Sequence, residues 1–415
     1  MSDASTARGH WKDRVGLAGQ WSWWLLCAVM PISGRYVPIV LVLTLAFTLI
    51  SSIGGPWRLD RALLWPLFAF YAWHVVGMAW STDIGFGLFD LQIKLGLVLL
   101  PLAAMVIMRR DPEALPNSML AFTAGALVAV VLSLWKASVC FGEFGWKECW
   151  TQSYLSYDLH PSYAAWYTCW ALLYWGRELI LGRCARGWLR AAILIAVPVL
   201  LIFSVLLASK SGLLGLGLVS AHLLFLVIRH LRGVARTGVW VGVALALFLG
   251  AWAVGPVVKV RVGAAVKAVR MAMVDGSSIY ASTEGNEERL VAWSCSAELL
   301  GADPLGAGTG DVKHALVACY GSHGAHDAAE RRLNSHSQFL QGGVALGWIG
   351  LVLALAVALV PLGEGIRRKE NLLVLFAGLF LMNASIESVL EVQAGVVFLS
   401  LFLGLLAKGG SNAPE

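Results

Sequence analysis

Charged residues are scarce in this chain: they make up only 13% of its 415 residues, whereas hydrophobic residues make up 58%. The mean hydropathy of +0.73 lies well above that of soluble globular proteins and excludes an ordinary soluble fold. No polar stretch is long enough for a separate soluble domain of typical size. Backbone groups in lipid must be satisfied internally, and the apolar runs have the length of helical spans. We therefore expect an all-α, polytopic integral membrane protein.

The apolar runs predict about twelve transmembrane helices, because roughly 20 residues of helix cross about 30 Å of hydrocarbon. They cover residues 16–33, 36–53, 62–80, 92–108, 118–135, 162–178, 190–207, 212–229, 238–255, 337–361, 371–386 and 392–407. One long segment separates the ninth span from the tenth. The expected organisation is therefore 1–255 (nine spans with short loops), 256–336 (a periplasmic segment with an interfacial helix and the catalytic motifs) and 337–415 (three spans and a tail).

The distribution of Lys and Arg predicts the orientation, because short cytoplasmic loops carry the excess of these residues. With the N-terminus inside, 18 of the 31 Lys and Arg lie on the cytoplasmic side, and the long outer segment is exempt from the rule. The charged N-terminal segment lacks a small-residue cleavage site, so we expect an uncleaved first helix. Both termini are thus expected in the cytoplasm. The formal charge of +6 then describes the inner face rather than nucleic-acid binding.

Metal-ligand spacings and nucleotide-binding loops are also missing. The stretch "GAGTGD" at 306–311 resembles a phosphate-binding loop but lacks its lysine. Cys140 and Cys149 fall in one outer loop, and Cys295 and Cys319 fall in the long segment. An oxidising compartment would permit two disulfides, and the sequence leaves the pairing open. The opening of the long segment, "PVVKVRVGAAVKAVRMAMVD", predicts either a basic amphipathic helix on the bilayer surface or a merely solvated basic face.

Ionisable groups at the membrane boundary are the first candidates for function, since such groups are costly at membrane depth. In "NSHSQFLQ", His336 precedes the tenth span, and an imidazole can take a proton from a hydroxyl near neutral pH. Asn334 and Gln338 could orient this histidine or bind sugar hydroxyls. The alternative is a helix N-cap at Ser335 or Ser337 with an interfacial histidine beside it.

Two cations could bind an anionic headgroup. Arg289 in "EERLVAW" heads an apolar helical stretch, and a guanidinium binds phosphate oxygens bidentately. The same residue could instead be one half of a surface ion pair. Lys210 in "LLASKSG" separates two spans at their outer ends, next to Ser209. It could contact a headgroup or only snorkel to the interface.

Further polar residues stand at the outer mouths of other spans. The stretch "YDLHPSYAAWY" brings His160 and Tyr163 to the start of the sixth span, where Pro161 also favours a helix start. Lys94 lies at the outer start of the fourth span, and "IESVLEVQ" adds two carboxylates on the same face. Together these groups predict a pocket for an anionic lipid headgroup more readily than a set of unrelated interfacial residues.

The order of these motifs resembles the O-antigen ligase and polymerase superfamily of the bacterial envelope. Its members show a Ser-Arg-Gly-like turn, an Arg-x-x-x-Trp helix, a Pro-Leu-x-Gly-x-Gly-x-Gly-like turn and a His-Asn/Ser-x-aromatic-Leu-Gln element before a Gly-rich helix start. The corresponding stretches here are "SKSG", "RLVAW", "PLGAGTG" and "HSQFLQGG". The resemblance covers residues 205–362 well, whereas the first ninety residues add only hydropathy.

The resemblance implies transfer of a glycan from an undecaprenyl-pyrophosphate carrier to a lipid A-core hydroxyl. The expected place is the periplasmic face of the bacterial inner membrane, with no cofactor and no metal. His336 matches the family histidine thought to activate the acceptor hydroxyl, and Arg289 matches a cation proposed to hold the pyrophosphate. Lys210 stands where arginine is usual, which keeps the charge but loses the bidentate fork. The expected partners are the lipid-linked donor, the lipid A-core acceptor and membrane lipids, with no nucleic acid.

Several alternatives remain beside the ligase. An O-antigen polymerase shares the fold and the motifs, and we favour the ligase because the outer segment opens with a basic stretch that could receive a phosphorylated core. A protein O-oligosaccharyltransferase is less favoured because we see no appended periplasmic domain. A secondary transporter also suits twelve spans, but its polar residues should lie near the midplane and its halves should repeat. A purely structural membrane protein is the remaining alternative.

Overall fold

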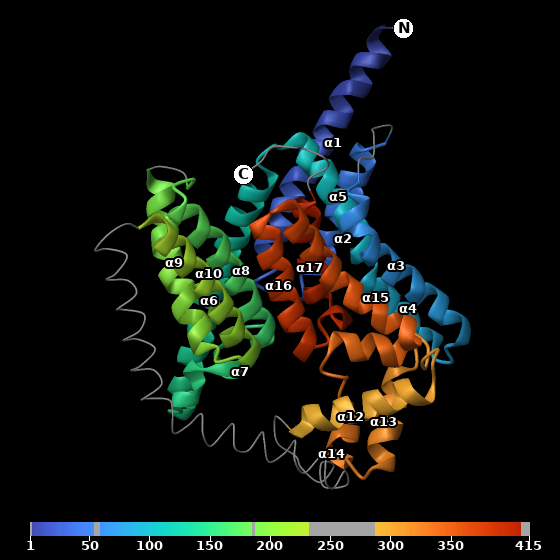
Figure 1. Ribbon diagram of the computed structural model, residues 1–415. Helices are drawn as coiled ribbons and strands as arrows, with labels where there is room; N and C mark the ends of the chain where they lie inside the picture. Colours follow the sequence, from blue (N-terminus) through green and yellow to red (C-terminus); the bar gives the residue numbers. More distant parts are fainter. Residues whose placement is uncertain (1, 54–58, 185–186, 232–286, 408–415) are drawn as a thin grey trace.

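The computed structural model describes residues 2–53, 59–184, 187–231 and 287–407, and this part of the chain is helical with no strand (Figure 1). The α-helices are α1 (Ser2–Val29), α2 (Val37–Ser51), α3 (Arg61–Gly77), α4 (Ile84–Lys94), α5 (Gly96–Arg110), α6 (Ala114–Phe144), α7 (Gln152–Leu155), α8 (Pro161–Ile180), α9 (Trp188–Leu206), α10 (Lys210–His230), α12 (Glu287–Ala302), α13 (Val312–Ser322), α14 (His326–Glu330), α15 (Gln338–Arg368), α16 (Asn371–Ile386) and α17 (Gln393–Leu406). The expected all-α class is confirmed. The predicted ninth span, 238–255, and the predicted basic surface helix lie outside the described residues.

Six helices of the described chain are long and apolar enough to cross a membrane. They are Arg61–Trp80, Ile84–Arg110, Ala114–Phe144, Trp188–Leu206, Lys210–His230 and Gln338–Arg368. Three shorter apolar helices, α2, α16 and α17, accompany them. The protein is therefore a helical protein of membrane type, while the number twelve and the long outer segment remain predictions.

Buried aromatic side chains from α6, α8 and α17 form the centre of the bundle. The ring of Phe398 stacks on Tyr167 with centroids 4.5 Å apart and meets the ring of Trp166 edge-on at 4.6 Å. Phe122 and Phe402 also meet edge-on at 5.2 Å. Offset and edge-on aromatic pairs contribute beyond their buried area, so this cluster fixes α17 against α6 and α8.

Helices α12, α13 and α14 lie together at one end of the bundle, away from the beginning of α1 (Figure 1). A second hydrophobic cluster joins them to α15: Val291 of α12 and Leu316 and Tyr320 of α13 pack with Val344 and Leu346 of α15. The start of α15 is therefore held between the membrane-type bundle and these three helices.

Helix α15 is kinked near its start, and the glycine-rich turn "ADPLGAGTGD" makes hydrogen bonds to the backbone groups at the kink. Gly347 has non-helical dihedral angles, so the backbone groups around it lose their partners within the helix. The N–H of Ala307 donates to the carbonyl of Val344 (2.9 Å), and the N–H of Trp348 donates to the carbonyl of Pro304 (3.2 Å). An interrupted helix at this depth is tolerated when protein groups satisfy its backbone.

The glycines of this turn are required by close backbone approach. Gly347 has φ of +64°, and a Cβ there would lie 1.8 Å from the carbonyl oxygen of Pro304. A Cβ at Gly306 would lie 2.4 Å from the backbone nitrogen of Gly347. The turn ends at Asp311, whose carboxylate accepts hydrogen bonds from the N–H (2.5 Å) and the hydroxyl (2.7 Å) of Thr82. The contacts of the turn thus connect α3, the start of α4 and α15, which is a structural role and not that of a phosphate loop.

Both cysteine pairs that the sequence allowed form disulfides. Cys140 at the end of α6 is bonded to Cys149 in the following loop. Cys295 of α12 is bonded to Cys319 of α13. The second bond holds the helix that carries Arg289 against its neighbour.

Candidate functional site

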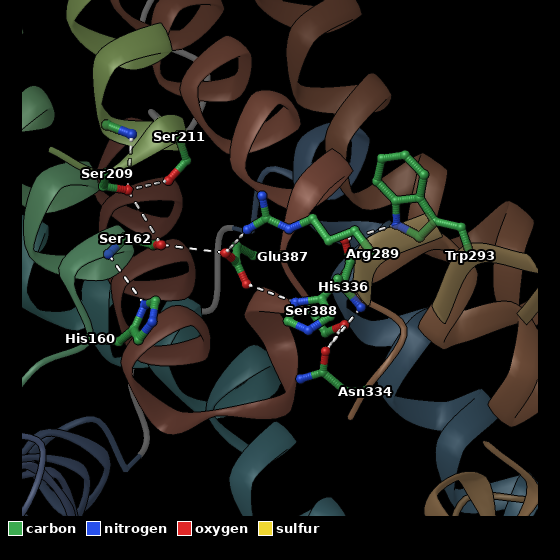
Figure 2. Close-up of polar contacts among 11 residues, drawn as sticks. His160, Ser162, Ser209, Ser211, Arg289, Trp293, Asn334, His336, Glu387 and Ser388 are labelled. Atoms are coloured by element: carbon green, nitrogen blue, oxygen red, sulfur yellow. Dashed lines mark hydrogen bonds and ion pairs between the residues drawn. The ribbon is translucent and has the colours of Figure 1, made fainter. Parts of the chain in front are cut away.

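His336 sits in a tight turn between α14 and α15. Its φ of +45° lies in the left-handed region, which costs about 1–3 kcal/mol for a residue with a side chain. The side chain of Asn334 accepts a hydrogen bond from the His336 N–H (2.9 Å), and the Trp293 indole N–H donates to the His336 carbonyl (3.3 Å). Asn334 also accepts from the hydroxyl of Ser388 (3.4 Å). These contacts hold the backbone of the turn, and the imidazole lies beside Glu387 (Figure 2).

The carboxylate of Glu387 lies between the histidine and the arginine that the sequence analysis selected. It accepts a hydrogen bond from Nη2 of Arg289 at 2.7 Å, and its Oε2 lies 3.6 Å from Nδ1 of His336. The hydroxyl of Ser162 donates to Oε1 of Glu387 at 3.4 Å, the same oxygen that accepts from Arg289. We call these four residues the Glu387 cluster. Figure 2 shows the carboxylate at its centre, with side chains arriving from α8, from α12 and from the turn before α15.

The electrostatics of the cluster favour an ionised carboxylate. Burial disfavours the charge of Glu387, but contact with His336 and the charge of Arg289 outweigh it and lower the pKa of this carboxyl below its ordinary value. His160 lies nearby, and desolvation lowers its pKa, with Glu387 opposing the shift and Arg289 adding to it. Nδ1 of His160 accepts a weak hydrogen bond from the Ser162 N–H (3.4 Å), as a neutral imidazole can.

A row of hydroxyls leads from the Glu387 cluster to the start of α10. Ser209 donates to Ser162 at 3.4 Å, and its hydroxyl lies 3.0 Å from that of Ser211. Ser209 also caps α10, because its Oγ accepts from the N–H of Gly212 (3.4 Å). Lys210, between the two serines, is exposed at the first position of the helix. The structure therefore places Lys210 next to the cluster's hydroxyl row.

Two residues expected to bind substrate have a different setting in the structure. The Lys94 side chain is fully buried, and its Nζ is paired with Asp90 and, at 3.1 Å, with Glu391. Gln338 is also fully buried: its amide donates to Glu391 (3.2 Å) and accepts from the N–H of Leu390 (2.6 Å). Buried groups with these partners hold the loop after α16 in place. Direct contact of Lys94 or Gln338 with a substrate does not fit this placement.

Tyr163 lies on the first turn of α8, partly buried against the hydrophobic core. It directly follows Ser162 of the Glu387 cluster, and the charges of Glu387 and Glu391 act on it. The structure thus groups His336, Arg289, Asn334, His160 and the Ser209 turn, with Tyr163 on the core side of the same helix turn as Ser162.

The imidazole of His336 is half-buried, and both of its ring nitrogens are buried. Among the described residues, neither ring nitrogen of His336 has a hydrogen-bond partner, although Nδ1 faces Glu387 at 3.6 Å. A buried polar atom without a partner costs about 1–3 kcal/mol. A hydroxyl that reached Nε2 would relieve this cost and could give up its proton there.

Residues 170–355 match the protein-family model described as O-antigen ligase. The matched region is similar to O-antigen ligases, a family of glycosyl-transferring membrane enzymes of ligase or polymerase type. Lys210, Arg289 and His336 fall inside the matched region, whereas Glu387 lies beyond its end. No curated protein matches the chain in a sequence comparison.

Glu387 and Ser162 were not selected as site residues by the sequence analysis. The only available signal for Glu387 was an ionisable residue at the outer end of a predicted span, which it shares with Glu391. In the structure, Glu387 faces His336, whereas Glu391 pairs with Lys94. Sequence position alone could not separate these two roles.

Proposed function

We propose that the protein transfers an O-antigen glycan from undecaprenyl pyrophosphate to a hydroxyl of the lipid A-core oligosaccharide. The observation that carries the proposal is the imidazole of His336, whose buried ring nitrogens have no hydrogen-bond partner among the described residues and whose Nδ1 lies 3.6 Å from the Glu387 carboxylate. Such a histidine can act as a general base for an incoming hydroxyl. The periplasmic face of the inner membrane is the place at which both substrates would meet.

The proposed reaction needs one proton transfer and one displacement. His336 takes the proton of the acceptor hydroxyl, and the hydroxyl oxygen bonds to the anomeric carbon of the donor sugar. The bond between that carbon and the pyrophosphate oxygen breaks, and the electron pair leaves with the pyrophosphate. The negative charge that develops on the departing pyrophosphate would be offset by nearby cations, because fixed positive groups stabilise a developing anion.

Arg289 and Lys210 are the cations proposed to hold the pyrophosphate. Arg289 gives Nη2 to Glu387, and a guanidinium has five N–H donors, so others remain for phosphate oxygens. Lys210 is exposed beside the hydroxyl row of Ser209 and Ser211, where an anionic headgroup could arrive. Glu387 contacts both Arg289 and His336. A donor bound at Arg289 would therefore lie close to an acceptor at His336.

A transfer assay tests this function. Purified protein is mixed with polyprenyl-pyrophosphate-linked glycan, with and without rough lipopolysaccharide. Product that forms only on the lipopolysaccharide supports the ligase. Lengthening of the lipid-linked glycan in its absence would mean an O-antigen polymerase instead, and glycan found on a protein acceptor would mean an O-oligosaccharyltransferase.

The His336→Ala variant should remain folded in membranes and lose transfer. The matched control is His326→Ala, which changes an exposed histidine on α14. Retained transfer in His336→Ala would remove this residue from the mechanism. A chelator should leave transfer unchanged, and inhibition would contradict the proposed metal-free chemistry.

A further inference from the structure

The disulfide between α12 and α13 lies within a set of four side chains that includes a histidine and a carboxylate. Cys295, Cys319 and His323 bring their ligand atoms within 4.8 Å of one another. Glu298 completes the set: its Oε2 lies 2.7 Å from Nε2 of His323 and 4.0 Å from the sulfur of Cys319. Two sulfurs, one imidazole nitrogen and one carboxylate oxygen form a donor set that Zn²⁺ accepts.

The grouping follows from helical spacing. Glu298 is three residues after Cys295 on α12, and His323 is four residues after Cys319 at the end of α13. Residues three or four apart share one helix face, so each helix contributes one pair of ligands. The two faces meet where the Cα atoms of the cysteines lie 5.9 Å apart.

We propose that the reduced form of this cysteine pair is a zinc site with Cys295, Cys319, His323 and Glu298 as its ligands. A dithiol reductant gives two electrons and two protons to the disulfide, yielding two thiols and the oxidised reductant. Zn²⁺ then displaces the two thiol protons and binds both thiolates, the neutral imidazole and the carboxylate. In this form the zinc ion, instead of the disulfide, links α12 to α13.

The geometry is close to what the metal needs. Zn–S bonds of about 2.3 Å and Zn–N or Zn–O bonds of about 2.0–2.2 Å place tetrahedral ligands roughly 3–4 Å from one another. The ligand atoms of Cys295, Cys319 and His323, which lie within 4.8 Å of one another, therefore need only small side-chain movements, and Glu298 already contacts His323 at 2.7 Å. The cysteines are buried, whereas the side chains of His323 and Glu298 are 33% and 55% exposed, so an ion can enter from the solvent side.

The position of the proposed zinc site means that the change between the disulfide and the zinc-bound form affects α12. This helix also carries Arg289, and its Trp293 donates to the carbonyl of His336. A bridge at Cys295 holds the helix next to α13 in either chemical form. The reduced, metal-free protein would lack that bridge.

The test measures metal rather than transfer, so it succeeds or fails independently of the proposed function. Purified protein is reduced with a phosphine, which leaves no competing thiol, then given Zn²⁺ and desalted, and bound zinc is measured with a chromophoric chelator. Reduced wild type should hold one equivalent and oxidised wild type none. Co²⁺ in place of Zn²⁺ should give the thiolate charge-transfer absorption of a tetrahedral site.

Variants identify the ligands. His323→Ala should weaken zinc binding by at least about 10- to 100-fold, which is the loss seen when only a group that hydrogen-bonds to a metal ligand is removed. Cys295→Ser with Cys319→Ser should abolish binding, and His326→Ala, the matched surface control, should bind as wild type does. Size-exclusion chromatography in detergent checks that each reduced, zinc-loaded protein is folded. The proposal is overturned if reduced wild type holds no zinc, aggregates despite zinc, or binds it no more tightly than His323→Ala.

Discussion

Replacing Glu387 by glutamine tests whether the carboxylate acts through His336. Glutamine keeps the size of the side chain and an oxygen that can still accept from Arg289 at the 2.7 Å contact, but it removes the negative charge. The Nδ1 of His336 then loses the anion that lies 3.6 Å away. If His336 becomes an imidazolium while it takes the acceptor proton, that charged form is no longer stabilised.

The distance sets the size of the effect. At 3.6 Å and an effective dielectric constant of about 20, a unit charge pair attracts by at most about 4.6 kcal/mol. Since about 1.4 kcal/mol corresponds to a factor of ten in rate, the upper limit is about three decades. His336 and Glu387 side chains remain 22% and 13% exposed, and water reduces the attraction. We expect a fall in kcat of about 10²- to 10³-fold, within the range that a general base contributes.

The assay is single-turnover transfer to rough lipopolysaccharide, with Glu330→Gln as the control for loss of an exposed carboxylate. Size-exclusion chromatography in detergent checks that each variant is folded. A fall in rate that is matched by loss of folded protein would mean that Glu387 only supports the fold. Wild-type kcat in the variant would refute the coupling between the two residues.

Three further predictions concern the neighbouring charges. Arg289→Ala should lower transfer about 100-fold and Arg289→Lys about tenfold, because a lost charge-assisted hydrogen bond costs about 1.5–3 kcal/mol; equal and mild losses in a kinetic assay would leave only an ion-pair role. Lys94→Met should destabilise the protein by about 3–5 kcal/mol, since Asp90 and Glu391 would stay buried without their cation, and an unchanged melting temperature in detergent would contradict this. The pKa of Glu387 is lowered below 4.5, so its ionised form stabilises the fold above that pH and the contribution is lost as pH falls through the lower folded value. The difference in melting temperature between wild type and Glu387→Gln should therefore be largest at pH 7 and shrink below pH 4.5, and a difference that grows on acidification would contradict the sign.

Much of the fold could be predicted because its signals are local. Apolar runs mark helices whatever their neighbours are, and the predicted runs within the described residues fall on helices. The stretch "PLGAGTG" was one of the motifs of the family resemblance, but the segment that it contacts could not be known from the sequence. The structure shows that this segment is the kink at Gly347, 41 residues after Gly306. A close approach between two distant turns leaves no periodic pattern in either of them.

The centre of the site could not be predicted for the same reason. Glu387 follows Arg289 by 98 positions, and nothing in "IESVLEVQ" distinguishes it from Glu391 four residues later. The setting of Lys94 could not be predicted either. A cation at a predicted helix mouth suggested a headgroup ligand, yet two carboxylates enclose it in the folded protein. Side-chain chemistry was readable from the sequence, but the pairing of charges depends on packing.

The three principal groups of the site are fixed by separate parts of the molecule. Arg289 is carried by α12, which the bond at Cys295 ties to α13. His336 stands in a turn that Asn334 holds from within. Glu387 begins a loop whose far end is held by buried Lys94 through Glu391. In the proposed reaction the donor needs a base and a cation in a fixed relation, and supports of this kind would reduce the ordering that binding otherwise requires. They also explain why the costly left-handed backbone at His336 can persist: surrounding contacts determine it more strongly than its own preference does.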